Sequence, residues 1–245
     1  PVGAIQSDRN PVMPWFCGGA IMLVSTFLAL ILMKEEYFVR KKYSFRKKFE
    51  EMVETVRSSV RYASGHDAVR FILILGIIQY FAIQAPNMQW QPLYVGFTGN
   101  KASLGLVWAG IALSVAFGGL LSGRFLAKCG HEKKALAFSQ IAIGLGIILA
   151  GAFKFFPISI TIFLLHEVAR GLFKPLHDVY LNDNIPSKER ATIISCGSIF
   201  RHLGGIVGLL VSGLVVIRTS IPFTWIASGL VLVIGTIIIA KNGKE

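Results

Sequence analysis

The chain has little charge for its length, and this shortage sets the class of protein. Only 16% of its 245 residues are Asp, Glu, Lys or Arg, whereas 53% are hydrophobic. Soluble domains carry about 25% charged residues, and the mean hydropathy of this chain is +0.62. Because the apolar residues form long runs without an amphipathic pattern, the composition indicates a membrane protein.

Signatures of enzymes, metal sites and cofactor sites are also missing. The three cysteines, Cys17, Cys129 and Cys196, form no disulfide framework, and no two of them have the spacing of zinc ligands. The sequence contains no GxxxxGK[ST] loop, no HExxH and no GxSxG. We therefore expect a protein that is not an enzyme, does not use ATP and needs no metal or other cofactor.

Seven apolar runs are long enough to cross a bilayer. A hydrocarbon core about 30 Å thick requires roughly 20 residues of α-helix, and the alternating segments of a β-barrel are not seen. The runs are Val12–Met33, Phe71–Trp90, Leu104–Leu126, Ala135–Phe153, Ile158–Leu181, Ala191–Ile217 and Ile221–Ala240. The sequence therefore predicts an all-α integral membrane protein with about seven transmembrane helices in the lipid bilayer.

Basic residues are divided unevenly between the two sides of these runs. The net charge is +12, and 18 of the 25 Lys and Arg residues lie at or beyond the ends of the first, third, fifth and seventh runs. Four lie on the other side and three lie within runs. Because Lys and Arg are enriched in cytoplasmic loops, we expect a multi-pass protein of the cell membrane. The N-terminus of this segment would lie outside and the C-terminus in the cytoplasm, and no nucleic-acid partner is expected.

One connection, residues 34–69, is long and basic. Its apolar residues recur at helical spacing up to Gly65, which indicates an amphipathic helix along the cytoplasmic surface. This helix either touches lipid or only keeps the connection soluble. The apolar positions are Phe45, Phe49, Met52, Val56 and Val60. The chain thus divides into residues 1–33 with one span, the linker 34–69, and a block of six spans in residues 70–245.

Polar residues share one face of the second run. Tyr80, Gln84 and Asn87 follow one another at steps of four and three, and Pro86 interrupts the backbone hydrogen bonds. Polar groups are costly in hydrocarbon unless they have partners or water. We therefore expect this face to look into the bundle and to line a pathway for substrate or ions.

Small residues form stripes in the third and sixth runs. Their helical spacing allows two helices to approach closely, so we expect both stripes to serve packing. The residues are Gly105, Ala109, Ala112, Ala116, Gly119 and Gly123 in the third run, and Gly204, Gly208 and Ser212 in the sixth.

The fifth run carries the clearest signal of a functional site. Its charged residues, spaced to share one helical face, are Glu167, Arg170, Lys174 and Asp178. Opposite charges at such spacing can pair. At 1.5 Å per residue, Glu167 lies roughly 14 Å and Arg201 of the sixth run roughly 15 Å from the ends of their runs. A charge at such depth costs on the order of 3 kcal/mol, so Glu167, Arg170 and Arg201 mark either a transport pathway or purely structural pairs.

Two further stretches of this sequence, together with the long basic linker 34–69, resemble features of one protein family. The loop Gly123-Arg-Phe-Leu-Ala-Lys128-Cys-Gly130-His-Glu-Lys133 is similar to a cytoplasmic signature, G-x-x-x-D-[RK]-x-G-[RK], with Ala127 in place of its Asp. The stretch RGLFKPLHDVYLNDNIPSKERATIISCGSIFRHLGG looks like the corresponding region of many bacterial members. On these features the chain resembles the major facilitator superfamily.

The resemblance implies a fold and a function. The seven runs would be helices six to twelve of twelve, with six of them in a C-terminal bundle, and Gly123, Lys128, Gly130 and Lys133 would belong to the cytoplasmic signature loop. The family's secondary transporters move small organic solutes by alternating access, and proton-coupled efflux is one form of this. Here Glu167 would carry the proton, because a buried carboxyl group can take up and release one.

A lone half cannot enclose a central cavity. We therefore expect the chain, which starts at Pro1, to be a C-terminal fragment whose partner is the missing N-terminal half of the same protein. Two alternatives stay open, a seven-helix membrane receptor and a non-transporting assembly subunit in which the buried charges only join helices.

Overall fold

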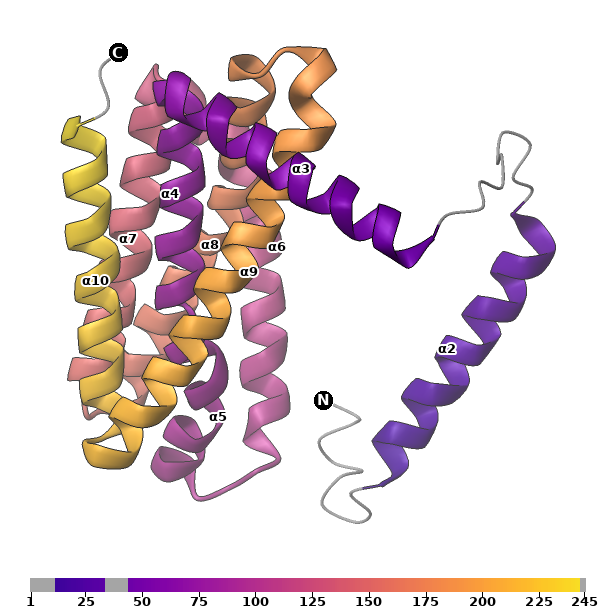
Figure 1. Ribbon diagram of the computed structural model, residues 1–245. Helices are drawn as coiled ribbons and strands as arrows, with labels where there is room; N and C mark the ends of the chain where they lie inside the picture. Colours follow the sequence, from indigo (N-terminus) through magenta and orange to yellow (C-terminus); the bar gives the residue numbers. More distant parts are fainter. Residues whose placement is uncertain (1–11, 34–43, 243–245) are drawn as a thin grey trace.

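A computed structural model describes residues 12–33 and 44–242 of the chain, and almost all of them are helical (Figure 1). The helices are α2 (Met13–Leu32), α3 (Phe45–Gly65), α4 (Asp67–Ala82), α5 (Gln84–Thr98), α6 (Ser103–Cys129), α7 (Glu132–Ala152), α8 (Phe156–Asn184), α9 (Ser187–Arg218) and α10 (Ile221–Asn242). Some basic residues counted for the topology lie outside the described residues, namely Arg9, Lys34, Arg40, Lys41, Lys42 and Lys244.

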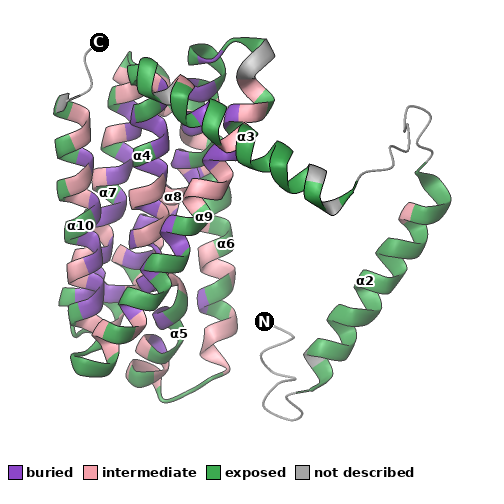
Figure 2. Ribbon diagram, in the orientation of Figure 1, coloured by how far each residue is buried: buried purple, intermediate pink, exposed green. Residues whose placement is uncertain are grey.

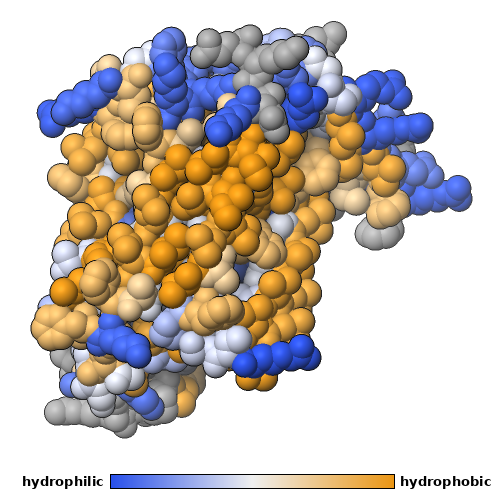
Figure 3. All heavy atoms as spheres, turned by 90° about the vertical axis from the view of Figure 1, so that its left-hand side faces the viewer, coloured by the Kyte–Doolittle hydropathy of each residue, from blue (hydrophilic) through white to orange (hydrophobic). Residues whose placement is uncertain are grey.

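Seven helical segments of this described part are long and apolar enough to span a membrane, with α4 and α5 counted as one. They confirm the prediction of an all-α membrane protein with seven spans. The polar surface gathers at the two ends of the bundle, and a broad apolar surface lies between them (Figure 3). Such a band is what a bilayer requires of the helices that face lipid.

The six later spans form one bundle. Within it α7 packs between α8 and α10, α6 packs on α8, and α4 packs on α9. The residues buried in this way are coloured purple in Figure 2. In contrast α2 stands apart, and its apolar window buries no residue. The amphipathic helix α3 ends at Gly65, as its sequence predicts, and contacts α4 and α9.

Close contacts between helices occur at glycines, but only one of the two predicted stripes is confirmed. In α9, a Cβ atom on Gly204 or Gly208 would collide with backbone carbonyl oxygens of α4. In α6 the prediction is not confirmed, since Ala112 and Ala116 are exposed in the described part of the chain. Instead Gly118 meets α8, where a Cβ atom on it would overlap the carbonyl oxygen of Val168. The contact forms there because α8 offers a glycine of its own, Gly171.

The close contact between Gly118 and Gly171 is reciprocal. A Cβ atom on Gly171 would in turn overlap the carbonyl oxygen of Val115 in α6. Backbone-to-backbone packing of this kind needs a small residue on both helices at the same level. A stripe on one helix therefore does not determine which of its faces is packed.

The second span is broken between α4 and α5. The sequence placed the interruption at Pro86, whereas the helix ends earlier, at Ala82, and restarts at Gln84. Proline has no N–H, so the carbonyl of the residue four positions before it lacks its helical donor. That carbonyl belongs to Ala82, and it accepts a hydrogen bond from the Ser228 hydroxyl of α10. The break is thus satisfied inside the bundle.

The close approach of α6 to α8 can be tested with a single methyl group. We expect Gly118→Ala to destabilise the protein by about 1–3 kcal/mol, because the added Cβ atom has no space. Gly123→Ala is the matched control on the same helix, since nothing lies within 4 Å of its Cβ position. Thermal unfolding in detergent measures both, and equal melting temperatures would contradict the packing described.

Candidate functional site

An ion pair within α8 joins this helix to α5. Arg170 Nη1 donates to Glu167 Oε1 at 2.8 Å and to Asn87 Oδ1 at 3.1 Å. Glu167 is only 1% exposed, whereas the Arg170 side chain is 25% exposed. The carboxylate therefore lies deeper in the protein than the guanidinium that neutralises it. Its second oxygen, Oε2, is buried and has no hydrogen-bond partner among the described residues.

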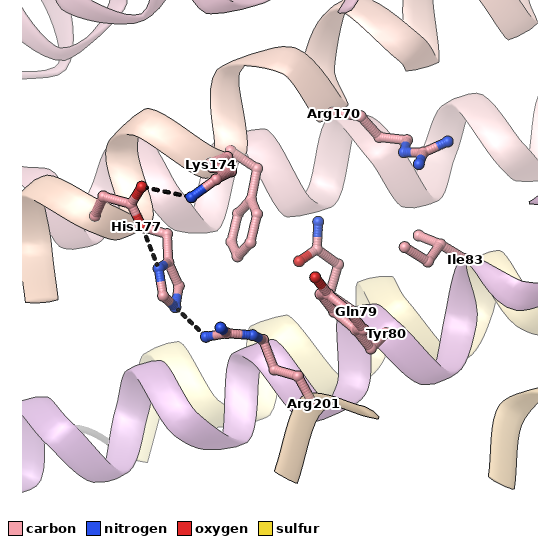
Figure 4. Close-up of a pocket in the computed structure, with 9 residues that line it drawn as sticks. Gln79, Tyr80, Ile83, Arg170, Lys174, His177 and Arg201 are labelled. Atoms are coloured by element: carbon pink, nitrogen blue, oxygen red, sulfur yellow. Dashed lines mark hydrogen bonds and ion pairs between the residues drawn. The ribbon is translucent and has the colours of Figure 1, made fainter. Parts of the chain in front are cut away.

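A second charged chain follows along the same helix (Figure 4). Lys174 Nζ lies 2.7 Å from Asp178 Oδ2, and His177 Nδ1 lies 3.2 Å from Asp178 Oδ1. From α9, Arg201 Nη1 lies 3.1 Å from His177 Nε2. The pairs predicted from the helical spacing in α8 are thus confirmed, and the chain extends to a second helix.

The hydrogen bonds of His177 fix its protonation in this arrangement. A guanidinium group can only donate, so Nε2 of His177 must accept from Arg201. The imidazole is then neutral, and its single proton lies on Nδ1, from which it donates to Asp178. A neutral imidazole therefore connects the charge of Asp178 to that of Arg201.

Arg201 reaches His177 by crossing α4 at a glycine. A Cβ atom on Gly76 would lie 3.0 Å from both Cγ and Cδ of Arg201, so a larger residue there would displace the side chain. The guanidinium lies 5.8 Å from the centroid of the Tyr80 ring, within the range of a cation–π contact. Three helices thus position one cation.

These side chains surround a cavity of about 320 Å³ between α4, α8 and α9. Its wall combines charged groups with apolar and aromatic ones, and its size lies at the lower end of small-molecule pockets. The lining residues are Gln79, Tyr80, Ile83, Arg170, Phe173, Lys174, His177, Asp178 and Arg201. Figure 4 shows the labelled side chains around the same space.

The site residues selected from the sequence fall into three groups. Tyr80, Arg170 and Arg201 line the cavity. Asn87 and Glu167 contact Arg170 and so lie one step behind the wall. Gln84 is not part of this constellation, because its Nε2 atom lies 3.0 Å from the Cβ position of Gly205 and thus packs against α9.

Four lining residues were not singled out from the sequence, and two of them, Gln79 and His177, are polar. Gln79 is 4% exposed, and its Oε1 atom has no hydrogen-bond partner in the described part of the chain. It precedes Tyr80, so the helical wheel assigned it to another face. His177 is 6% exposed, and its place beside Asp178 was the signal that could have selected it.

The predicted signature loop lies where α6 ends and α7 begins. Gly130 has φ of +71°, and its N–H donates to the Leu126 carbonyl at 3.0 Å, so it terminates α6 in the left-handed conformation that glycine favours. Lys133 Nζ lies 5.6 Å from the centroid of the Phe71 ring, while Gly123 and Lys128 are exposed. None of the four lines the cavity.

Comparison with known proteins gives one match. Residues 70–242 match the family model of the Major Facilitator Superfamily. The matched range contains α5 to α10 and all of α4 after its first three residues, and therefore every residue that lines the cavity. No curated protein and no solved structure matches the chain. Among the described residues, no group of three His, Cys, Asp or Glu could hold a metal ion.

The energetic coupling of Glu167 and Arg170 is testable with a double-mutant cycle. Arg170→Gln leaves a buried carboxylate without its cation, so we expect a loss of roughly 3 kcal/mol. The double variant Glu167→Gln/Arg170→Gln should lose less than the two single losses combined, because no unpaired charge remains. Thermal unfolding of the purified protein in detergent measures this, and strictly additive losses would show that the pair is not coupled.

Proposed function

The chain belongs to the major facilitator superfamily, a family of membrane transporters, and from this premise we propose that it is the C-terminal half of a secondary active transporter. The protein would move a small organic solute by alternating access between two halves. The six spans from α4 to α10 form this half, and α2, which buries none of its apolar window, would belong to the N-terminal half.

The ion pair of Glu167 and Arg170 is the observation that supports this proposal most. A carboxylate that is 1% exposed and 2.8 Å from a guanidinium lies in a helix that crosses the membrane. When Glu167 takes up a proton it loses its charge, and its attraction for Arg170 weakens. Arg170, which lines the cavity, is then free to change partners. A proton on Glu167 would in this way alter the wall that the solute contacts.

Coupling requires that proton and solute affect the same element. Asn87 of α5 shares Arg170 with Glu167, and α5 begins directly after the break at Ile83. Ile83 also lines the cavity. A change in the partners of Arg170 would therefore act on a helix end that is already interrupted, where a small rotation disturbs few backbone hydrogen bonds. We propose that this break transmits the change during alternating access.

A non-transporting assembly subunit is the second candidate, in which the same pairs would only join helices. The mixed polar and apolar cavity beside Arg170 favours transport, because a purely structural pair needs no open space. The family match removes the seven-helix receptor from consideration.

The orientation in the cell membrane follows from the basic residues. We propose that the ends near Lys101 and Arg218 lie outside and that the ends near Lys128 and Lys241 lie in the cytoplasm.

Cysteine labelling tests this orientation. In a full-length protein without other cysteines, Lys101→Cys should react with a membrane-impermeant maleimide in intact cells. Lys128→Cys should react only after permeabilisation, since both positions are exposed but would lie on opposite sides. The reverse pattern would invert the topology.

Transport itself is tested with the full-length protein in liposomes that contain a pH-sensitive dye. With an imposed proton gradient, a panel of small organic anions, cations and neutral solutes is added in turn. We expect at least one class of solute to move protons, and Glu167→Gln to reduce that movement at least about tenfold. Glu50→Gln, an exposed carboxylate of α3 paired with Arg46, is the matched control and should keep full activity.

The proposed coupling would be contradicted if protons moved without any added solute, or if the Glu167→Gln protein moved protons as fast as the unaltered protein. A Glu167→Gln protein that folds poorly but transports normally per folded molecule would show that the carboxylate joins helices and does not couple protons. Absence of transport for every solute in the panel would favour the non-transporting assembly subunit.

A further inference from the structure

The charges around the cavity do not cancel. Arg170 has Glu167 at 2.8 Å, and Lys174 has Asp178 at 2.7 Å. Arg201 has no carboxylate partner among the described residues, since its contacts are a neutral imidazole and an aromatic ring. Three cations thus face two carboxylates, each already paired. One positive charge remains, and it is located at Arg201.

A partly buried guanidinium without a counter-ion is energetically unfavourable, so it attracts an anion. Its planar array of donors matches the two oxygens of a carboxylate. His177 occupies only one of these donors, Nη1. Asp178 cannot serve as the partner in this arrangement, because Lys174 and His177 already bind its two oxygens.

The rest of the wall specifies what else the ligand should carry. Phe173, Tyr80 and Ile83 provide an aromatic and apolar surface, and the cavity volume of about 320 Å³ suits a small organic molecule. The Oε1 atom of Gln79 is a buried acceptor without a partner among the described residues. An O–H or N–H group of a ligand would satisfy it, and an unmade hydrogen bond of this kind is costly.

We propose that this cavity binds the transported solute through a negatively charged group held by Arg201, so that the substrates are small organic monoanions with an apolar or aromatic body. The inference rests on the proposed transport function and names its substrate class. A cationic solute would meet Arg170, Lys174 and Arg201 in a wall whose carboxylates are occupied. A neutral solute would leave the charge of Arg201 unbalanced.

Thermal shift measurements on the full-length protein in detergent test the charge preference. The probes are benzoate and phenylacetate, their neutral counterparts benzamide and phenylacetamide, and the cations of benzylamine and phenethylamine, each at millimolar concentration. The two carboxylates should raise the melting temperature, and the amides and amines should not. Because the members of each set differ mainly in charge, shape alone cannot produce this result.

Variants then locate the bound anion. Arg201→Gln should weaken the apparent affinity for benzoate about tenfold or more, since it removes a charge-assisted hydrogen bond. The apparent affinity of Arg201→Lys for benzoate should lie between that of the unaltered protein and that of Arg201→Gln, because lysine keeps the charge without the planar donors. Arg218→Gln, at the exposed end of the same helix, is the matched control and should bind benzoate like the unaltered protein.

The inference is overturned if neither carboxylate stabilises the protein, if the amines stabilise it more, or if Arg201→Gln binds benzoate unchanged. Its failure can be separated from failure of the proposed function. If cationic solutes drive proton movement that depends on Glu167, the transporter function is retained and the anion site is rejected. If the carboxylates bind at Arg201 but no solute moves protons, the anion site is retained and the proposed proton coupling is rejected.

Discussion

A charged or backbone polar group inside hydrocarbon must find its partner within the protein, and this constraint connects the helices of the bundle. Glu167 is neutralised within its own helix, but Arg170 also binds Asn87, which ties α8 to α5. The Ala82 carbonyl, left without a donor by Pro86, accepts from Ser228 and ties α4 to α10. The contacts that satisfy polar groups are therefore also the contacts that hold separate spans in place.

Glycines determine where these polar contacts can form. Gly118 and Gly171 bring α6 and α8 together at their backbones, and Gly204 and Gly208 do the same for α9 and α4. With α9 held against α4, Gly76 leaves the space through which Arg201 passes to reach His177. The cavity thus results from tight packing on both of its sides. Its one unbalanced charge, on Arg201, lies where three helices meet, and our proposal assigns the missing partner to an anionic substrate.

Local properties of the chain were predictable from sequence. Hydropathy gave the seven spans, and helical spacing gave the pairs in α8, because both depend on residues close together in the chain. Contacts between helices were harder to predict from the sequence. Within the described part of the chain most of the stripe in α6 is not packed, since the close contact there also depends on Gly171 of α8. Gln84 packs on α9, and Gln79 and His177 line the cavity, because the face that a helix turns inward depends on its neighbours. The break at Ile83 follows from Pro86, but the partner of the freed Ala82 carbonyl was not predictable, because Ser228 lies far along the chain.

The central claim is that Glu167 exchanges a proton and in doing so releases Arg170 to change partners, while Asp178 stays bound to Lys174. Infrared difference spectra of the full-length protein in lipid, recorded across a change of pH, measure this directly. The account predicts a protonated-carboxyl C=O band that disappears in Glu167→Gln and persists in Asp178→Asn, whose carboxylate is bound by Lys174. A spectrum in which no carboxyl band depends on Glu167 would contradict the account.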